Sequence, residues 1–241
     1  MTHPLSAAAL LAIWEENWQR PPLWQGLALL MAANPEQDWD ALLAMPMGAF
    51  NAHLLTLHCW HFGPTLTAVT TCTGCGALIE VTLDAAELCA AQHESPPAWV
   101  EITHDAARFR VRLPAPGDLL AAGAAATIED AAALLLARCL ETPDALPPPE
   151  RAAALTASVT AALERADPLA VIELGGACPH CAQAWSAFLD VAAFLWREVQ
   201  TWAQRTLQEV HLLARAYGWH EADILALTPV RRQAYLQMVY G

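Results

Sequence analysis

Cys72-Thr73-Gly74-Cys75-Gly76 and Cys178-Pro179-His180-Cys181 decide the fold of this 241-residue chain. Two residues between cysteines let both sulfurs point at one ion, and two such turns supply four thiolates, which suits tetrahedral zinc. Glycines at positions 74, 76, 175 and 176 permit tight backbone next to the cysteines. We therefore expect one structural Zn²⁺ bound by Cys72, Cys75, Cys178 and Cys181.

Sequence typical of strands flanks the two cysteine motifs. Residues 65–71 are rich in Thr and Val, residues 78–83 alternate, and residues 169–174 are apolar and β-branched. This layout predicts a split zinc ribbon, with two knuckles that face each other. The separation is unusual, because 102 residues lie between Cys75 and Cys178 where a compact ribbon has about 15 to 20. Two alternatives stay open: free or oxidisable thiols, and redox chemistry of a single CxxC pair.

Apolar periodicity predicts an α+β fold that is mainly α. Helical N- and C-terminal parts surround a small β region. The expected segments are an N-terminal helical module, the first knuckle with β-hairpins, an Ala/Leu-rich helical insert, the second knuckle and C-terminal helices, at residues 1–63, 64–117, 118–168, 169–188 and 189–241.

The C-terminal part carries the clearest helical pattern. Apolar residues fall on one stripe at steps of three, four or seven, with the polar Thr206 between Trp202 and Val210. They are Phe188, Ala192, Leu195, Val199, Trp202, Val210, Leu213 and Tyr217. Gly218 is expected just past the end of this helix. Thr228 is expected to cap a final helix that has Pro229 in its first turn.

Charge and composition exclude several classes of protein. The net charge is −13, and all 12 basic residues are arginine, so the clustered positive charge that a nucleic-acid surface needs is missing. Breaks at proline, glycine and histidine interrupt the uncharged residues 41–79, so no membrane span is expected. Seven cysteines, an odd number, fit thiols or metal ligands in a reducing cytoplasm better than a disulfide framework.

Catalytic motifs are missing from the sequence, which contains no nucleophile elbow, phosphate loop or framed pair of carboxylates. We expect no catalytic residues and no enzymatic activity. The ten tryptophans exceed what one core of this size usually takes, so some could anchor a partner, with burial in the core as the equal alternative. The candidate partner-binding residues are Trp196, Trp202, Trp219, Arg231, Arg232 and Tyr235.

The order of motifs resembles that of the baseplate hub assembly family of T-even-type phages, in the form found in bacterial contractile injection system and prophage clusters. The resemblance covers essentially the whole chain, and its most specific part is EVHLLARAYGWHEADILALTPVRRQAYL, residues 209–236. Carried over by position, the four cysteines are the metal knuckles. The C-terminal signature is Glu209, His211, Tyr217, Gly218, Trp219, Arg231, Arg232 and Tyr235. The chain departs from the pattern at Ala49, where a charged residue is expected. Its first knuckle lacks proline, and its second lacks the following glycine.

The resemblance implies a non-enzymatic assembly factor or structural component of the baseplate hub of a contractile particle. Its partners would be hub, spike or wedge proteins, with no nucleic acid. It would act in the cytoplasm, as a chaperone that departs or as a component incorporated into the particle. The alternative is a zinc-ribbon adaptor in transcription or another nucleic-acid process, which the acidic charge disfavours.

Overall fold

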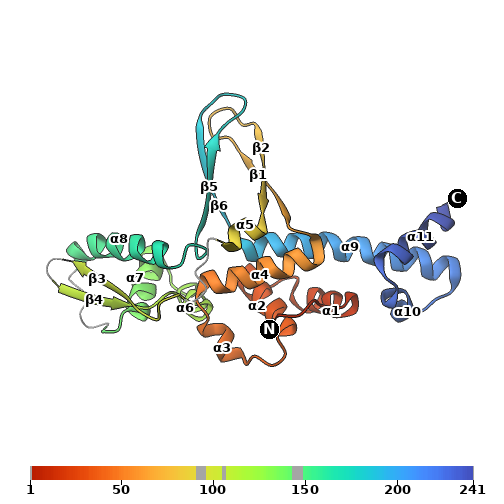
Figure 1. Cartoon of the computed structure of the whole chain (residues 1–241), viewed down its shortest axis with the longest axis horizontal. Helices are drawn as coiled ribbons and strands as arrows, with labels where there is room; N and C mark the ends of the chain where they lie inside the picture. The colour runs from red at the N-terminus through yellow and green to blue at the C-terminus, as the bar shows by residue number, and fades with distance from the viewer. Residues whose placement is uncertain (1, 91–95, 105–106, 143–148, 241) are drawn as a thin grey trace. The chain divides into compact units, whose positions relative to one another are not determined.

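The computed structural model describes residues 2–90, 96–104, 107–142 and 149–240. Helices dominate these residues, and the strands among them form three separate two-stranded sheets (Figure 1). The α+β class with a mainly helical chain is therefore confirmed. The chain folds into two compact units: Met1–Glu36 together with Ala192–Gly241, and Gln37–Val191. The five segments expected from the sequence stay a prediction, and residues 143–148 of the expected insert lie outside the described residues.

The described residues of the first unit form helices only. These are α1 (Ala7–Asn17), α2 (Pro22–Ala33), α9 (Val191–Tyr217, apart from its first residue), α10 (Glu221–Ala226) and α11 (Pro229–Tyr240). Sequence signals set where they begin. The Ala9 N–H donates to Ser6 Oγ at 3.2 Å before α1, and the Arg231 N–H donates to Thr228 Oγ1 at 3.3 Å before α11.

The long helix α9 follows the expected apolar stripe from Ala192 onward. Buried positions of this stripe are Ala192, Leu195, Val199, Thr206, Val210 and Leu213. The inclusion of Phe188 was wrong, because the helix begins only at Val191 and Phe188 is a strand residue that is 72% exposed. Gly218 ends the helix as expected, with φ at +70° and its N–H donating to Ala214 O at 2.8 Å.

The C-terminal helices share a small core. Val210 and Leu213 of α9 pack with Ile224 of α10 and Leu236 of α11. Helix α10 was not expected from the sequence, because its six residues are too few for a periodic pattern.

The second unit contains all of the strands. Its helices are α3 (Trp39–Ala44), α4 (Met47–Phe62), α5 (Ala85–Ala90), α6 (Pro116–Ala122), α7 (Ile128–Cys139) and α8 (Pro149–Ala166). Its strands pair as antiparallel hairpins β1 (Thr65–Thr71) with β2 (Leu78–Asp84), β3 (Val100–His104) with β4 (Ala107–Val111), and β5 (Ile172–Ala177) with β6 (Ala184–Leu189).

The insert between the cysteine motifs has its own core. Ile102 and Phe109 from hairpin β3–β4 pack with Leu136 of α7 and Leu155 of α8. Beside this core, the carboxylate of Asp118 is only 2% exposed and accepts hydrogen bonds from Arg112, Arg138 and the Ala115 N–H. The insert is thus an organised body, not a loose loop.

Two buried hydrogen bonds tie the N-terminal part of α4 to the segment that precedes β5. The Gly48 N–H of α4 donates to Asp167 Oδ2 at 2.8 Å, and the Asn51 Nδ2 donates to the Leu169 carbonyl at 2.7 Å. Helix α4 leads into β1, and residues 167–169 lead into β5. The bonds therefore join two segments that lie more than 100 residues apart in the sequence and place the start of β5 beside α4. Figure 1 shows hairpins β1–β2 and β5–β6 side by side.

Candidate metal centre

The two cysteine motifs form tight turns with the same backbone hydrogen bonds. In the first, the Cys72 N–H donates to Ala77 O at 2.8 Å and the Gly76 N–H donates to Cys72 O at 2.9 Å. In the second, the Cys178 N–H donates to Gln183 O at 2.8 Å and the Ala182 N–H donates to Cys178 O at 2.9 Å. Each turn joins the two strands of one hairpin, so each hairpin ends in a knuckle.

The position after the second cysteine of each knuckle needs left-handed backbone. Gly76 has φ +72° and Ala182 has φ +59°. Alanine pays a steric cost in this conformation that glycine does not. Gly175 and Gly176, expected to serve the second turn, instead lie in strand β5. A Cβ atom added at Gly176 would lie 3.5 Å from the Trp185 ring, which is ordinary van der Waals contact. Aligning the two knuckles by their cysteines would have identified Ala182 as the turn residue.

The four sulfurs meet at the tips of the hairpins. Cys72 Sγ lies 3.7 Å from Cys181 Sγ, and Cys75 Sγ lies 3.7 Å from Cys178 Sγ. All four sulfurs lie within 4.8 Å of one another. Four sulfurs at tetrahedral positions about 2.3 Å from a zinc ion would be about 3.8 Å apart. The donor set and its spacing therefore fit a tetrahedral metal site.

Backbone N–H groups surround the sulfurs. Those of Cys75 and Gly74 donate to the Cys72 sulfur and lower the pKa of that thiol to about 6. The His180 N–H lies 3.4 Å from the Cys178 sulfur. The pKa of Cys181 rises to about 12, against the lowering effect of the Gln183 N–H, because the other three sulfurs crowd it. A cation at the centre would remove this competition between thiolates.

The knuckles also interlock outside the sulfur cluster. A Cβ atom on Gly74 would lie 1.9 Å from Gln183 Oε1, so the end of the Gln183 side chain occupies the space beside Gly74. Its Nε2 lies 3.5 Å from Thr73 Oγ1. Two of the cysteines also belong to a small apolar core. Cys72, Ile79 and Cys178 are buried together in it, and Val81 and Trp185 pack against them.

This centre is the one cluster of its kind in the described part of the chain. No other group of three or more His, Cys, Asp or Glu side chains there could hold a metal ion. Soft thiolates in a tetrahedral set select zinc or an iron–sulfur centre rather than magnesium or calcium. Four cysteine ligands fill the coordination sphere of zinc and leave no position for water or substrate.

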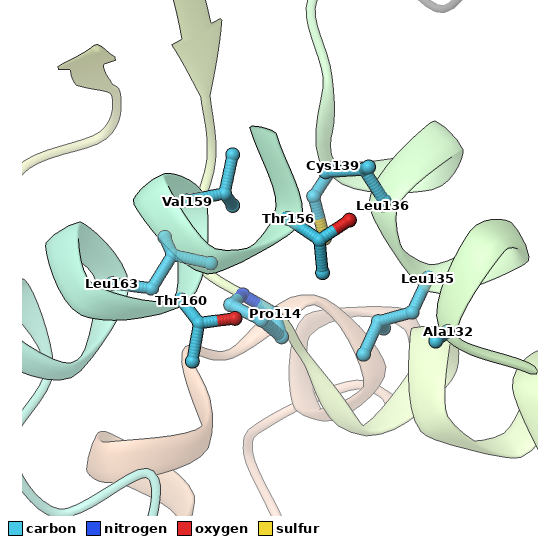
Figure 2. Close-up of a pocket in the computed structure, with 9 residues that line it drawn as sticks. All are labelled: Pro114, Ala132, Leu135, Leu136, Cys139, Thr156, Val159, Thr160 and Leu163. Atoms are coloured by element: carbon cyan, nitrogen blue, oxygen red, sulfur yellow. The ribbon is translucent and has the colours of Figure 1, made fainter. Parts of the chain in front are cut away.

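The remaining cysteines lie elsewhere. Cys59 and Cys89 are half-buried, and burial is the main cause of the raised pKa of each thiol. Cys139 is buried beside a cavity of about 140 Å³ between α7 and α8 (Figure 2). Burial raises the pKa of Cys139 to about 11, so that thiol stays protonated at neutral pH. The other residues that line the cavity are apolar or threonine, which offers no acid–base chemistry.

The six candidate partner-binding residues differ in exposure. Trp196 and Arg232 are 5% and 3% exposed, whereas Trp202, Trp219 and Tyr235 are half-buried and Arg231 is exposed. The Arg232 Nε donates to Glu209 Oε2 at 3.1 Å, so Arg232 holds α11 against α9. Whether any of these residues contacts a partner stays a prediction.

The signature aromatic residues of the C-terminus gather into one cluster. Trp219 stacks on Tyr217 at a centroid distance of 4.7 Å and meets the edge of Tyr235 at 4.8 Å. Tyr217 is 39% exposed. The cluster therefore combines ring packing with a solvent-facing aromatic side chain, an arrangement that suits an interface.

Sequence reasoning missed the groups that position the centre. The Asn51 and Asp167 bonds and the Gln183 contact join residues far apart in the sequence, and none has a local motif. The Asp118 cluster in the insert was also missed, although the bond from the Ala115 N–H to Asp118 is a local pattern at the start of α6. No helix in the described ranges is both long and apolar enough to cross a membrane. Comparison with family models, curated proteins and solved structures finds no match to this chain.

Proposed function

We propose that this chain is a non-enzymatic assembly factor or structural component of the baseplate hub of a contractile phage tail-like particle. In this proposal Cys72, Cys75, Cys178 and Cys181 bind one structural Zn²⁺. The observation that carries the proposal is the four-sulfur centre at the hairpin tips. A ligand set of this kind fixes backbone and leaves no open position for a reaction. The sequence resemblance supplies the assembly in which it works.

Zinc would act here by holding the two hairpins together. A two-stranded hairpin alone is marginally stable in water, and the apolar contact between these two consists of few side chains. Binding of a structural zinc ion supplies folding free energy directly. The chain therefore uses the metal to present a rigid pair of hairpins beside its helices, and the partners would be hub, spike or wedge proteins.

Sedimentation combined with pull-down tests the proposal. Tagged protein is recovered from cells that make the contractile particle, and sheathed particles are separated from free complexes. Co-sedimentation with particles identifies a component. Recovery only with free hub, spike or wedge proteins identifies a chaperone that departs. Recovery with none of these proteins overturns the proposal, and salt-dependent binding to DNA in that case would favour the adaptor function.

Elemental analysis of the purified protein tests the metal. We expect about one zinc per chain, since the four cysteines make one site. Iron with a visible absorption band would instead indicate an iron–sulfur centre. Neither metal, with the four thiols of the centre open to labelling, would refute a structural metal site.

A further inference from the structure

The exposed side chains of α9 include no carboxylate, and all of them except that of Ala216 can donate a hydrogen bond. These exposed residues are Arg197, Gln200, Thr201, Gln204, Arg205, Gln208, His211, Arg215, Ala216 and Tyr217. Arg197 and Arg215 are 18 positions apart, which is five helical turns, so they lie on the same side of the helix about 27 Å apart. We call Arg197, Gln204, Gln208, His211 and Arg215 the donor row.

Acidic residues of α9 lie away from this row. Glu198 and Glu209 are half-buried, and by helical geometry they point about 100° and 120° away from Arg197. The Glu209 carboxylate is engaged by Arg232 at 3.1 Å and by Arg205 at 3.8 Å. The carboxylates of the helix therefore do not neutralise the donor row.

This face contrasts with the charge of the whole chain. The net charge is −13, yet residues 192–241 contain five arginines and four acidic residues. The other parts of the chain therefore carry the whole negative charge. A basic face that an acidic protein keeps free of carboxylates is complementary to carboxylates supplied from outside.

We propose that the donor row binds an acidic helix of a partner protein. The row is straight and about five turns long, which matches the side of a second helix packed along α9. Arginine binds carboxylates with two donors, and the glutamine amides between the arginines suit carboxylates or polar side chains on the partner. Ion pairs at this exposed site set orientation and partner choice more than affinity.

Other occupants fit the row less well. Nucleic acid presents closely spaced phosphates over a long distance and is held by clustered positive charge, whereas the arginines at the ends of this row are far apart. A second copy would bring another net charge of −13, which opposes association. An acidic helix on a partner needs only local negative charge along one side.

This inference rests on the proposed function in one respect, because both require that the partner is a protein. The test places a photo-crosslinking benzoylphenylalanine at Gln208, an uncharged exposed position in the middle of the row, in the full chain expressed in its own cells. The crosslinked segment is identified by mass spectrometry. We expect a segment of another protein with Asp or Glu repeated at three- or four-residue spacing.

Charge reversal supplies the decisive comparison. The double variant Arg197→Glu/Arg215→Glu should lower the crosslink yield about tenfold or more, because it places like charges opposite each other. Arg108→Glu/Arg165→Glu is the matched control, with the same change in net charge at exposed arginines of the other unit. It should leave the yield unchanged. Equal melting temperatures for the parent and both variants show that folding is intact.

The remaining outcomes overturn the inference. A crosslink to a second copy, to nucleic acid or to a segment without carboxylates is one such outcome. The others are a crosslink yield that the charge reversal of Arg197 and Arg215 leaves unchanged, and the absence of any crosslink. If the protein still sediments with hub proteins in such a case, only the donor row is refuted. An acidic crosslinked helix from a protein outside any contractile particle would instead keep the row and refute the proposed function.

Discussion

Replacement of Cys178 by serine tests how far the metal stabilises the hairpins. Cys178 is buried and lies 3.7 Å from the Cys75 sulfur. Serine is a poor ligand for zinc because its hydroxyl stays protonated and is hard rather than soft. Zinc binding in small structural sites is worth about 10–16 kcal/mol, which is comparable with the whole stability of a typical domain, about 5–15 kcal/mol. The variant should therefore lose its zinc and its ordered knuckles.

The effect on the rest of the unit is smaller, because α4 and the insert core have contacts of their own. If about 3 kcal/mol of the binding free energy is transmitted to the unit Gln37–Val191, its melting temperature falls by about 6–12 °C. Calorimetry and zinc analysis measure both quantities. Hydrogen exchange should show loss of protection in β1, β2, β5 and β6 and retained protection in α7.

Cys59→Ser is the matched control for this prediction. It makes the same chemical change at a half-buried cysteine outside the centre, so it should retain full zinc content and most of the stability. Unchanged melting of Cys178→Ser, or equal zinc in both variants, would refute the argument that the metal holds the hairpins together.

Three further predictions follow from the geometry. Gly76→Ala should lower the stability of the zinc-bound protein by about 1 kcal/mol, and Ala182→Gly should leave it equal or raise it by up to about 1 kcal/mol, because both positions have left-handed backbone. Chemical denaturation measures both changes, and opposite signs would contradict the assigned backbone strain. Asp118→Asn should cost about 2–4 kcal/mol at pH 7, because a carboxylate that holds two arginines is lost. Burial opposes the charged form of Asp118, but the arginines hold its pKa below the usual value, so this stability is fully present at neutral pH and is lost as acid protonates the folded carboxyl. A cost that does not decrease as the pH is lowered would refute it. Cys139, which is buried and has a pKa of about 11, should react with iodoacetamide more slowly at pH 8 than the half-buried Cys59. Labelling as fast as Cys59 would contradict its burial.

Local patterns predicted most of the elements. Thr and Val before Cys72 predicted β1, and the steps of three and four after Ala192 predicted α9, because in both cases one face is buried and its period shows in the sequence. The sequence did not predict strand β6, and it placed the exposed Phe188 on the stripe of the helix that follows. Phe188 happens to continue the helical spacing, and only the hairpin pairing with Glu173 places it in a strand.

The sequence predicted which four cysteines cluster, but it did not predict the contacts that support the cluster. The spacing of the cysteines is a local constraint on one metal ion, so it is visible without a structure. The bonds of Asn51 and Asp167 span 118 and 119 positions, and no local pattern shows which distant backbone group a buried amide or carboxylate will reach. Trp196 shows the same limit, because the sequence does not reveal that its ring is buried.

The long separation of the two knuckles has a simple energetic explanation. Loop-closure entropy grows only with the logarithm of loop length, so extending a loop from about 18 residues to about 100 costs about 1.5 kcal/mol. That is small beside the free energy of zinc binding. The insert then reduces even this cost, because its core of Ile102, Phe109, Leu136 and Leu155 orders part of the loop and the hydrogen bonds from α4 hold residues 167–169 just before β5. A ribbon split by 102 residues would therefore be only slightly weaker as a metal site than a compact one, provided that the insert folds. Destabilising the insert core by Leu155→Ala should accordingly weaken zinc retention against a chelator, whereas Val230→Ala, at an exposed position of α11, should not.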